Sequence, residues 1–550
     1  MNLLTYIQGI DNWKSLDEKL QYDNDNQIKG DVFEKLTKYY LLFKPEYVSL
    51  LKNVWLGSEI PDRIIKKLGI PAQDQGIDLI AQTQEGDFWS IQCKYHGVNK
   101  RKISHREVST FISLSFGVAK DIKHAIICTT ADDYAKLYRG KENIGFVLSD
   151  EWNKLGKEFF SFVRALESKK EVKRKAPFKP FKHQQRALKN AKEHFLKEKN
   201  TRGKLVFPCG AGKSLTGYWI TRELKANNII IAVPSLALVK QTLEVYLEQS
   251  YANHEHLKWL CVCSDEGIGR ADDVAIYTQD IGVPCVTNTD KIAEWLIKNK
   301  SKRTVVFTTY QSGEKIAEAS RKAKMSFDLG IMDEAHKTVG ATDKLFSHLL
   351  FDKNISIDKR IFMTATERRY KGNSEDVLSM DDPDMYGDTF EQMSFKEAIE
   401  SNILCDYKII TLFISDDEVK NLVDDNVLVK PKGSKWNAET EARTLASLIA
   451  LRKAIKKYNI KHSVTFHSSI SRAVSFMKSQ EPFTEKYKEF SSVDAFHVAG
   501  SMPTAQRSKI IDAFATSKKA IITNARCLTE GVDVPRPIFT IISVAHIQMA

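Results

Sequence analysis

A short glycine-rich segment has residue types that are suited to binding phosphate: Gly210, Gly212, Lys213 and Ser214. The segment follows an apolar run typical of a buried strand and precedes a stretch that predicts a helix. In such a unit, backbone N–H groups and the helix N-terminus approach the anion, and a lysine adds a full positive charge. We expect Lys213 to contact phosphates and Ser214 to hold Mg²⁺ beside them. Because Phe207 replaces the first glycine of G-x-x-x-x-G-K-[ST], a plain glycine-rich turn is the alternative for this segment alone.

Two adjacent carboxylates, Asp333 and Glu334, directly follow the apolar run 329–332, which predicts a buried strand. Ligands of open α/β sheets bind beyond the carboxyl ends of the strands, where both acids would lie. In phosphoryl transfer, one acid holds Mg²⁺ and another positions the nucleophile. We therefore expect Asp333 to hold Mg²⁺ through water, Glu334 to orient and deprotonate the attacking water, and His336 to couple the nucleotide to neighbouring groups.

Two further positions fit a nucleotide site. The predicted strand at 359–363 is followed by the hydroxyl side chains of Thr364 and Thr366, which we expect to act with His336 in coupling the nucleotide to neighbouring groups. Gln184 falls in the first turn of a predicted helix, where its amide can read the adenine edge of a nucleotide; an ordinary polar first turn is the alternative. With the phosphate loop, these positions predict an ATP-binding α/β domain.

A second kind of chemistry is predicted near the N-terminus. Asp78 lies between apolar neighbours in a predicted strand at 76–81, and the next strand, at 88–95, alternates so that Gln92 and Lys94 share one face. Carboxylate and carbonyl oxygens can hold Mg²⁺, which polarises a phosphate and activates a bound water, while a lysine orients that water. A hairpin that joins the three residues therefore predicts phosphodiester cleavage. Taken singly, each is typical of the solvated face of a strand.

The composition indicates a large globular protein with an anionic partner. The chain has 550 residues, which corresponds to roughly three or four domains, and a net charge of +12. Nucleic acid is the expected partner rather than a membrane, because no apolar run approaches the ~20 residues of a spanning helix. The eight cysteines include no C-x-x-C pair, and the N-terminus lacks the pattern of a secretion signal. We expect a cytoplasmic protein with reduced cysteines.

The segments Gly76-Ile77-Asp78 and Gln92-Cys93-Lys94 resemble the PD-(D/E)xK nucleases, in particular their Mrr-like branch. The resemblance implies a catalytic role for Asp78, Gln92 and Lys94, with Asp78 as a metal ligand. It also implies a metal-proximal role for Glu34, which lies on an amphipathic helix predicted at 31–42. Gln92 replaces the more usual acid, so the predicted metal site carries one charge fewer.

The phosphate loop, Asp-Glu-Ala-His and Thr-Ala-Thr arrive in the order seen in superfamily 2 helicases and translocases of the DEAH-box form, which this region resembles. The resemblance implies that Thr529 and Gly531 face nucleic acid and that Asp533 faces the nucleotide ribose. In the second lobe, the first strand is predicted at 407–412. The family expects a Gln-x-x-Gly-Arg motif whose arginine reaches the γ-phosphate, and Gln548–Ala550 resembles only its opening. We expect the N-terminal part of a longer protein, with weak ATP hydrolysis by this fragment.

The predicted fold class is α/β: a restriction-endonuclease-like domain followed by two RecA-like lobes, the second truncated. The predicted boundaries are 1–165 for the nuclease, 166–180 for a linker, 181–399 for the first lobe and 400–550 for the second. The linker is rich in lysine and closes with two prolines. It either follows a phosphate backbone or forms a solvated tether.

A nuclease followed by such a motor resembles the front half of a type ISP restriction enzyme, a single-chain, ATP-dependent enzyme in which a methyltransferase and a target-recognition domain follow. The resemblance implies ATP-driven movement along double-stranded DNA coupled to Mg²⁺-dependent cleavage of foreign DNA. Two alternatives stay open. One is a stand-alone defence or repair helicase-nuclease without a methyltransferase, and the other is a DNA-binding motor whose nuclease fold is inactive.

Overall fold

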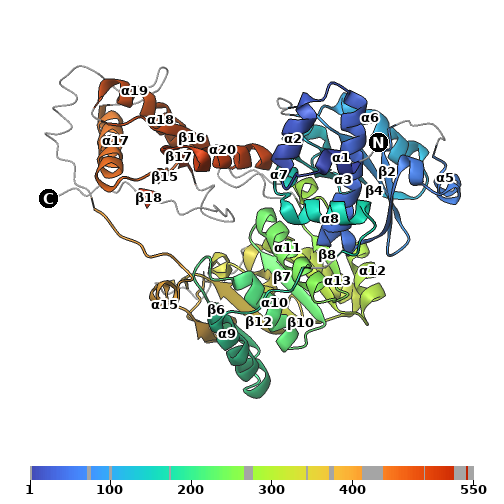
Figure 1. The fold of residues 1–550 in the computed structure, drawn as a ribbon. Helices are drawn as coiled ribbons and strands as arrows, with labels where there is room; N and C mark the ends of the chain where they lie inside the picture. Colours follow the sequence, from blue (N-terminus) through green and yellow to red (C-terminus); the bar gives the residue numbers. More distant parts are fainter. Residues whose placement is uncertain are drawn as a thin grey trace. The chain divides into compact units, whose positions relative to one another are not determined.

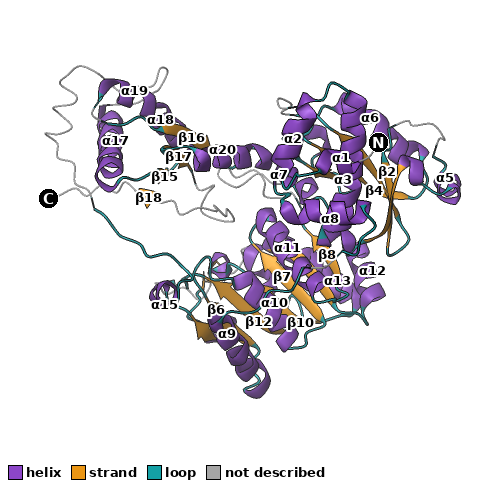
Figure 2. Ribbon diagram, in the orientation of Figure 1, coloured by secondary structure: helices purple, strands orange, loops and turns teal. Residues whose placement is uncertain are grey.

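The computed structural model describes residues 3–70, 76–97, 102–172, 175–264, 277–341, 345–370, 377–411, 438–488, 490–525 and 541–542. The chain divides into two compact units (Figure 1). The first comprises Met1–Glu266 and Tyr277–Asp406, and the second holds the described residues from Tyr407 onward. Helices flank sheets in both units (Figure 2), which confirms the α/β class. None of the helices in the described ranges is long and apolar enough to cross a membrane.

The N-terminal part of the first unit is built on a five-stranded sheet of order β1-β2-β3-β4-β5. β1, β2 and β3 pair antiparallel, whereas β3, β4 and β5 run parallel. Because parallel strands are covered on both faces, β4 and β5 are almost entirely buried. The strands are β1 (Leu51–Leu56), β2 (Leu79–Thr83), β3 (Phe88–Lys94), β4 (Ile122–Thr129) and β5 (Ile144–Val147).

The principal helix of this part, α3 (Asn26–Phe43), contacts β1 and β3 and includes the helix predicted at 31–42. The Asp25 carboxylate caps it by accepting hydrogen bonds from the N–H groups of Gln27 and Ile28. The other helices are α1 (Leu3–Ile7), α2 (Trp13–Tyr22), α4 (Pro45–Val48), α5 (Asp62–Leu68), α6 (His105–Ser113), α7 (Ser149–Asn153) and α8 (Lys157–Glu167).

The rest of the first unit is organised on a seven-stranded sheet of order β14-β6-β12-β10-β7-β9-β8, all parallel. The strands are β6 (Arg202–Val206), β7 (Asn228–Val233), β8 (Lys258–Val262), β9 (Thr304–Thr309), β10 (Phe327–Met332), β12 (Ile357–Thr364) and β14 (Asp388–Gln392). The helices are α9 (Lys182–Lys192), α10 (Lys213–Glu223), α11 (Leu236–Ala252), α12 (Thr289–Asn299), α13 (Gly313–Ala323), α14 (Pro383–Tyr386) and α15 (Phe395–Glu400). A small separate sheet pairs β11 (Gly340–Ala341) with β13 (Val377–Leu378).

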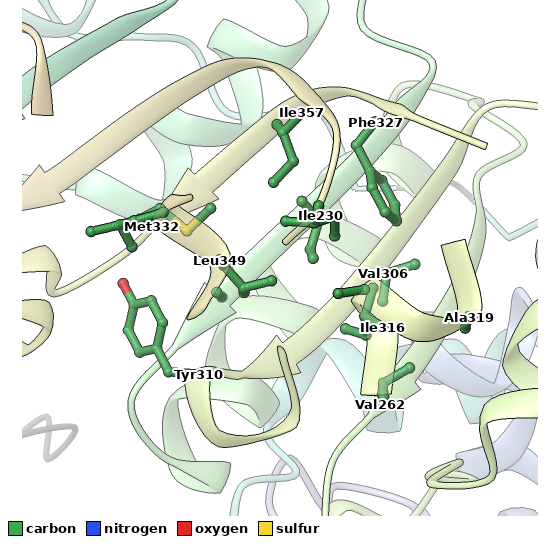
Figure 3. Close-up of a cluster of buried hydrophobic side chains, with 14 of the residues drawn as sticks. Ile230, Val262, Val306, Tyr310, Ile316, Ala319, Phe327, Met332, Leu349 and Ile357 are labelled. Carbon is green, nitrogen blue, oxygen red and sulfur yellow. The ribbon is translucent and has the colours of Figure 1, made fainter. Parts of the chain in front are cut away.

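Figure 3 shows the hydrophobic core on one face of this sheet. Strand residues such as Ile230, Val306 and Phe327 meet Ile316 from α13 and Leu349 from a short 3₁₀ helix. All five side chains are fully buried, and each such burial stabilises the fold by roughly 1.5–3 kcal/mol. This core fixes the strands whose carboxyl ends carry the motor motifs.

The second unit contains a parallel sheet of order β16-β17-β15-β18. Its elements are α17 (Ala438–Tyr458), β15 (His462–Phe466), α18 (Ile470–Lys478), α19 (Gln480–Lys486), β16 (Asp494–Val498), α20 (Thr504–Thr516), β17 (Ala520–Asn524) and β18 (Ile541–Ile542). The strand predicted at 407–412 is wrong over its described residues, 407–411, which are irregular and exposed. Its apolar residues suggested a strand, but none of the described strands pairs with it.

Candidate ATPase and nuclease sites

The phosphate loop connects β6 to α10, as the sequence predicts. Gly210 and Gly212 have φ angles of +84° and +79°, a left-handed conformation that favours glycine. A Cβ at Gly212 would lie 2.6 Å from Nε2 of Gln184, and one at Gly210 would lie 3.1 Å from Leu404. The backbone conformation therefore favours glycine at both positions, and a side chain at either one would also displace a neighbouring side chain. Lys213 and Ser214 open α10, so the helix N-terminus lies at the loop.

The order of the strands brings the motor motifs to one edge of the sheet. β6, β12 and β10 are neighbours, with Val206 paired to Thr364 and Met332 paired to Phe362. The phosphate loop, Thr364 and Asp333 therefore follow adjacent parallel strands at their carboxyl ends, where ligands of such sheets bind. Lys213 and Asp333 therefore belong to the same edge of the sheet.

Lys213 approaches the predicted catalytic base. Its Nζ lies 3.8 Å from Oε1 of Glu334. It also donates a long hydrogen bond of 3.4 Å to the carbonyl of Phe207. Both charged side chains are largely buried, at 9% and 17% exposure. Glu334 has a φ angle of +49°, which is uncommon for a residue with a side chain. Backbone strain of this kind clusters at functional sites.

Two hydrogen bonds hold Asp333 in place, one from the backbone of the next residue and one from a tyrosine that the sequence did not indicate. The Tyr310 hydroxyl donates to the Asp333 carbonyl at 2.7 Å, and the Asp333 carboxylate accepts from the Glu334 N–H at 2.9 Å. Burial, followed by the Glu334 carboxylate, raises the pKa of Asp333 to about 6, although Lys213 opposes the change. A buried carboxylate with so little positive charge around it is a suitable ligand for a hard cation.

The coupling residues form a chain of contacts. Nδ1 of His336 lies 3.1 Å from the Thr364 hydroxyl, which donates to the carbonyl of Thr366 at 2.9 Å. The same imidazole nitrogen lies 3.4 Å from the Glu334 carboxylate. The structure therefore brings together all three residues expected to couple the nucleotide to the rest of the motor.

Gln184 is buried against the phosphate loop. Its amide oxygen accepts a hydrogen bond from the Phe181 N–H at 2.8 Å, and its amide nitrogen donates to the Gly212 carbonyl at 3.3 Å. Beside it, Nε2 of His183 lies 3.0 Å from the Ala211 carbonyl. Both side chains thus brace the loop backbone, a role for His183 that no sequence pattern indicated.

In the N-terminal sheet, the β2–β3 hairpin aligns the predicted nuclease residues. Leu79 pairs with Ile91, so Asp78 stands opposite Gln92, one step along the antiparallel register. Opposite residues of an antiparallel pair share a face, and Lys94 shares it too, two residues beyond Gln92. The Asp78 carboxylate accepts a hydrogen bond of 2.6 Å from the Cys93 N–H.

Gln92 carries a buried oxygen with no hydrogen-bond partner. The side chain is only 3% exposed, and its amide nitrogen donates to the Gly76 carbonyl at 3.0 Å. Its Oε1 atom is buried and unpartnered. Because buried polar atoms are nearly always satisfied, an orphaned oxygen opposite a carboxylate fits a site for an oxygen-binding cation.

Glu34 reaches the same region from α3. The Cys93 thiol has its pKa raised well above the ordinary value, chiefly by burial, and the carboxylates of both Asp78 and Glu34 contribute. α3 also packs against β3, so both acids lie on elements that meet at this strand. Within the described ranges, no three His, Cys, Asp or Glu side chains cluster to hold a metal.

Three predicted motor residues lie outside the described residues: Thr529, Gly531 and Asp533. Their expected contacts with nucleic acid and ribose stay predictions.

Known families cover most of the chain. Residues 43–140 match the family described as Restriction endonuclease, and residues 177–369 match Type III restriction enzyme, res subunit. Residues 447–544 match Helicase conserved C-terminal domain. The fold and the family matches together define a class in which a restriction-endonuclease region is followed by two helicase-type regions.

Within that class the chain is similar to type ISP enzymes. The structure of the ATP-dependent Type ISP restriction-modification enzyme LlaBIII bound to DNA is 26% identical, with a TM-score of 0.75, over 94% of this chain and 35% of that one. A nuclease-deletion mutant of the Type ISP enzyme LlaGI, in complex with a DNA substrate mimic, is 25% identical over 63% of this chain and 25% of that one, with a TM-score of 0.43.

A viral protein is also similar. "Probable helicase A859L" of African swine fever virus (strain Badajoz 1971 Vero-adapted) is 24% identical over 335 residues, 60% of this chain and 34% of that protein. The chain therefore spans about a third of the length of LlaBIII and of this viral protein.

Proposed function

We propose that this chain is the nuclease and motor part of an ATP-dependent restriction endonuclease, which moves along double-stranded DNA and cleaves it with Mg²⁺. The observation that carries the proposal is the presence of two separate sites in one compact unit. One is the Lys213–Glu334 pair beside the phosphate loop, and the other is Asp78 facing the unpartnered oxygen of Gln92. Further domains in the same protein, such as the methyltransferase and target-recognition domains expected from the resemblance, are part of the proposal.

In the ATPase site, Mg²⁺ held by Asp333 and Ser214 would neutralise charge on the phosphates. Lys213 binds the transferred phosphoryl group, and the loop N–H groups bind its neighbours. Glu334 orients the attacking water and accepts its proton. Because Glu334 contacts His336 and His336 contacts Thr364, a movement of the base is passed to the end of β12.

In the nuclease site, Asp78 and Gln92 present the oxygens that fit a hard cation, and Glu34 adds a second carboxylate. A metal held by these oxygens would polarise the scissile phosphate and activate a bound water. Lys94, on the same strand face, orients that water and offsets the negative charge that builds on the phosphate.

The proposal is tested with supercoiled plasmid DNA incubated with Mg²⁺ or Mn²⁺, with and without ATP. Asp78→Ala is expected to lower the nicking rate on the order of a hundredfold or more, because the ligand that fixes the metal is lost. Asp87→Ala is the matched control, since Asp87 is an exposed acid at the other end of the same hairpin. Equal nicking by Asp78→Ala and the parent protein would remove the nuclease assignment.

One observation favours a second candidate, a DNA-binding motor with an inactive nuclease fold: Gln92 is uncharged where related nucleases carry an acid. That candidate predicts DNA-stimulated ATP hydrolysis without metal-dependent nicking by the parent protein. The same plasmid assay, run beside an ATPase assay, separates the two.

A further inference from the structure

The nuclease domain and the first ATPase lobe are joined by directional polar contacts. The Tyr47 hydroxyl donates to the Gly282 carbonyl at 2.8 Å, and the Trp259 indole donates to the Ser49 hydroxyl at 2.8 Å. Arg139 donates to the Tyr277 hydroxyl at 2.9 Å. Such contacts, unlike apolar ones, fix the orientation of the two domains.

Lys240 of α11 lies at the centre of this joint. Its Nζ lies 2.8 Å from the Glu151 carboxylate and donates to the Asp280 carbonyl at 2.9 Å. Glu151 is only 5% exposed and also forms ion pairs with Lys154 at 2.7 Å and with Lys44 at 3.5 Å. Burial alone would raise the pKa of Glu151, but the lysines, Lys240 foremost, hold it well below its ordinary value. Glu151 is thus a buried carboxylate that a lysine from the other domain stabilises together with two lysines of its own domain.

Glu151 is adjacent to Trp152, which is fully buried inside the nuclease domain. The Trp152 indole donates to the Thr129 carbonyl at 3.0 Å, and its ring lies 4.8 Å from that of Phe33 and 4.9 Å from that of Tyr40. The Tyr40 hydroxyl donates a hydrogen bond of 3.3 Å to the Glu151 carboxylate. Trp152 and Glu151 therefore clamp α3 and the end of β4.

Those contacts lead directly to the nuclease site. Phe33 precedes Glu34 in α3, and Thr129 is the β4 partner of Lys94. We propose that Lys240 of the ATPase lobe is a positioning residue for the nuclease, which holds Glu34 and Lys94 in place through Glu151 and Trp152. The inference rests on the proposed nuclease function.

The position of α11 connects this contact to the ATPase motifs. The helix starts at the end of β7, beside β10 in the sheet, and Ser235 caps its N-terminus by accepting from the Leu238 N–H at 3.4 Å. Its position is therefore set by the same sheet edge that carries the ATPase motifs. A displacement of that edge would reach the nuclease through Lys240 without crossing any flexible linker.

The test compares Lys240→Met, which removes the charge, with Lys240→Arg, which keeps it. Lys240→Met is expected to lower the plasmid nicking rate by tenfold to about a hundredfold, because small misplacements of catalytic groups have effects of that order. Lys240→Arg is expected to recover most of that loss, and ATP hydrolysis is expected to remain close to the parent rate in both. Lys258→Met is the control, since Lys258 makes a partly exposed interdomain ion pair with Glu85.

Hydrogen exchange gives a readout that does not require cleavage. Lys240→Met is expected to speed exchange of the amides of α3 and β3, while those of β6 and α10 keep the parent rates. Unchanged exchange in α3 and β3, or unchanged nicking, would overturn the positioning role. If Lys240→Met does not fold, Glu151→Gln is measured in the same way with the same expected result.

The two readouts also separate this inference from the proposed function. A parent protein that does not nick DNA contradicts the proposed nuclease, and the exchange experiment then still decides whether Lys240 holds α3 and β3. If the parent protein and the Lys240→Met variant nick DNA at the same rate, the result supports the nuclease and overturns the positioning role.

Discussion

The ammonium group of Lys213 lies 3.8 Å from the carboxylate of Glu334, so the lysine of the phosphate loop pairs with the glutamate expected to act as the base. A triphosphate would compete for the same ammonium group. Its binding would draw Lys213 away from Glu334 and leave that carboxylate free to accept a proton from water. We therefore expect the pair to link nucleotide binding to activation of the base.

Replacing Lys213 with alanine in the full-length enzyme is expected to lower DNA-stimulated ATP hydrolysis on the order of a hundredfold or more, because a preorganised charge on the transferred phosphoryl group is lost. DNA binding is expected to persist. Phosphate release and DNA mobility shift measure the two properties. Lys189→Ala, an exposed lysine of α9, is the control. Retained DNA-stimulated hydrolysis in Lys213→Ala would reject the phosphate-loop assignment.

Glu334→Gln is expected to bind ATP but to turn it over at least about a hundredfold more slowly, because an amide cannot accept the proton from water. Binding of a fluorescent ATP analogue, measured beside steady-state hydrolysis, separates the two effects. Normal turnover would show that another group is the base.

Gln92→Glu is expected to raise the affinity for Mn²⁺ roughly tenfold, since the added carboxylate supplies the charge that the nuclease site lacks. Without metal, the variant is expected to be less stable by about 1–3 kcal/mol, because a buried carboxylate would face Asp78. Calorimetric titration and thermal unfolding with and without Mn²⁺ measure both effects. Gln82→Glu, on β2 of the same hairpin, is the control; equal Mn²⁺ affinity in Gln92→Glu and the parent would place the metal elsewhere.

Local patterns were sufficient to predict the hairpin that aligns Asp78 with Gln92. Strand alternation and a short turn fix the register within a few residues, so the shared face of Gln92 and Lys94 follows from the sequence. The motor motifs were similarly predictable, because each one directly follows an apolar strand. The strand predicted at 407–412 was wrong, since a strand also needs a neighbour with which to pair, and local pattern does not supply that information.

The contacts that hold the sites in place were not predictable in this way. Glu151 and Lys240 are distant in sequence, and each reads as an ordinary charged residue of a helix. Their pairing depends on how two domains dock, which leaves no periodic signal. Tyr310 was passed over for the same reason, because its hydrogen bond to Asp333 joins the segments that follow β9 and β10, two strands that are not neighbours in the sheet.

His124 is expected to make the protein sensitive to acid. Its ring is 2% exposed beside Trp89, neither nitrogen has a hydrogen-bond partner, and burial lowers its pKa to about 3. Between pH 6.5 and 3 the unfolded chain therefore binds more protons at this residue than the folded chain, so the free energy of unfolding falls as the pH falls.

At pH 5.5 this residue is expected to lower the free energy of unfolding by about 1.4 kcal/mol relative to pH 7.5, since the unfolded imidazole has a pKa of about 6.5. Urea unfolding of the parent and of His124→Leu at the two pH values measures the difference. His124→Leu is expected to lose about that much less stability on acidification, whereas the exposed His105→Leu should follow the parent. The same loss in the parent and His124→Leu would mean that the ring is protonated in the folded protein, and that its two nitrogens have partners.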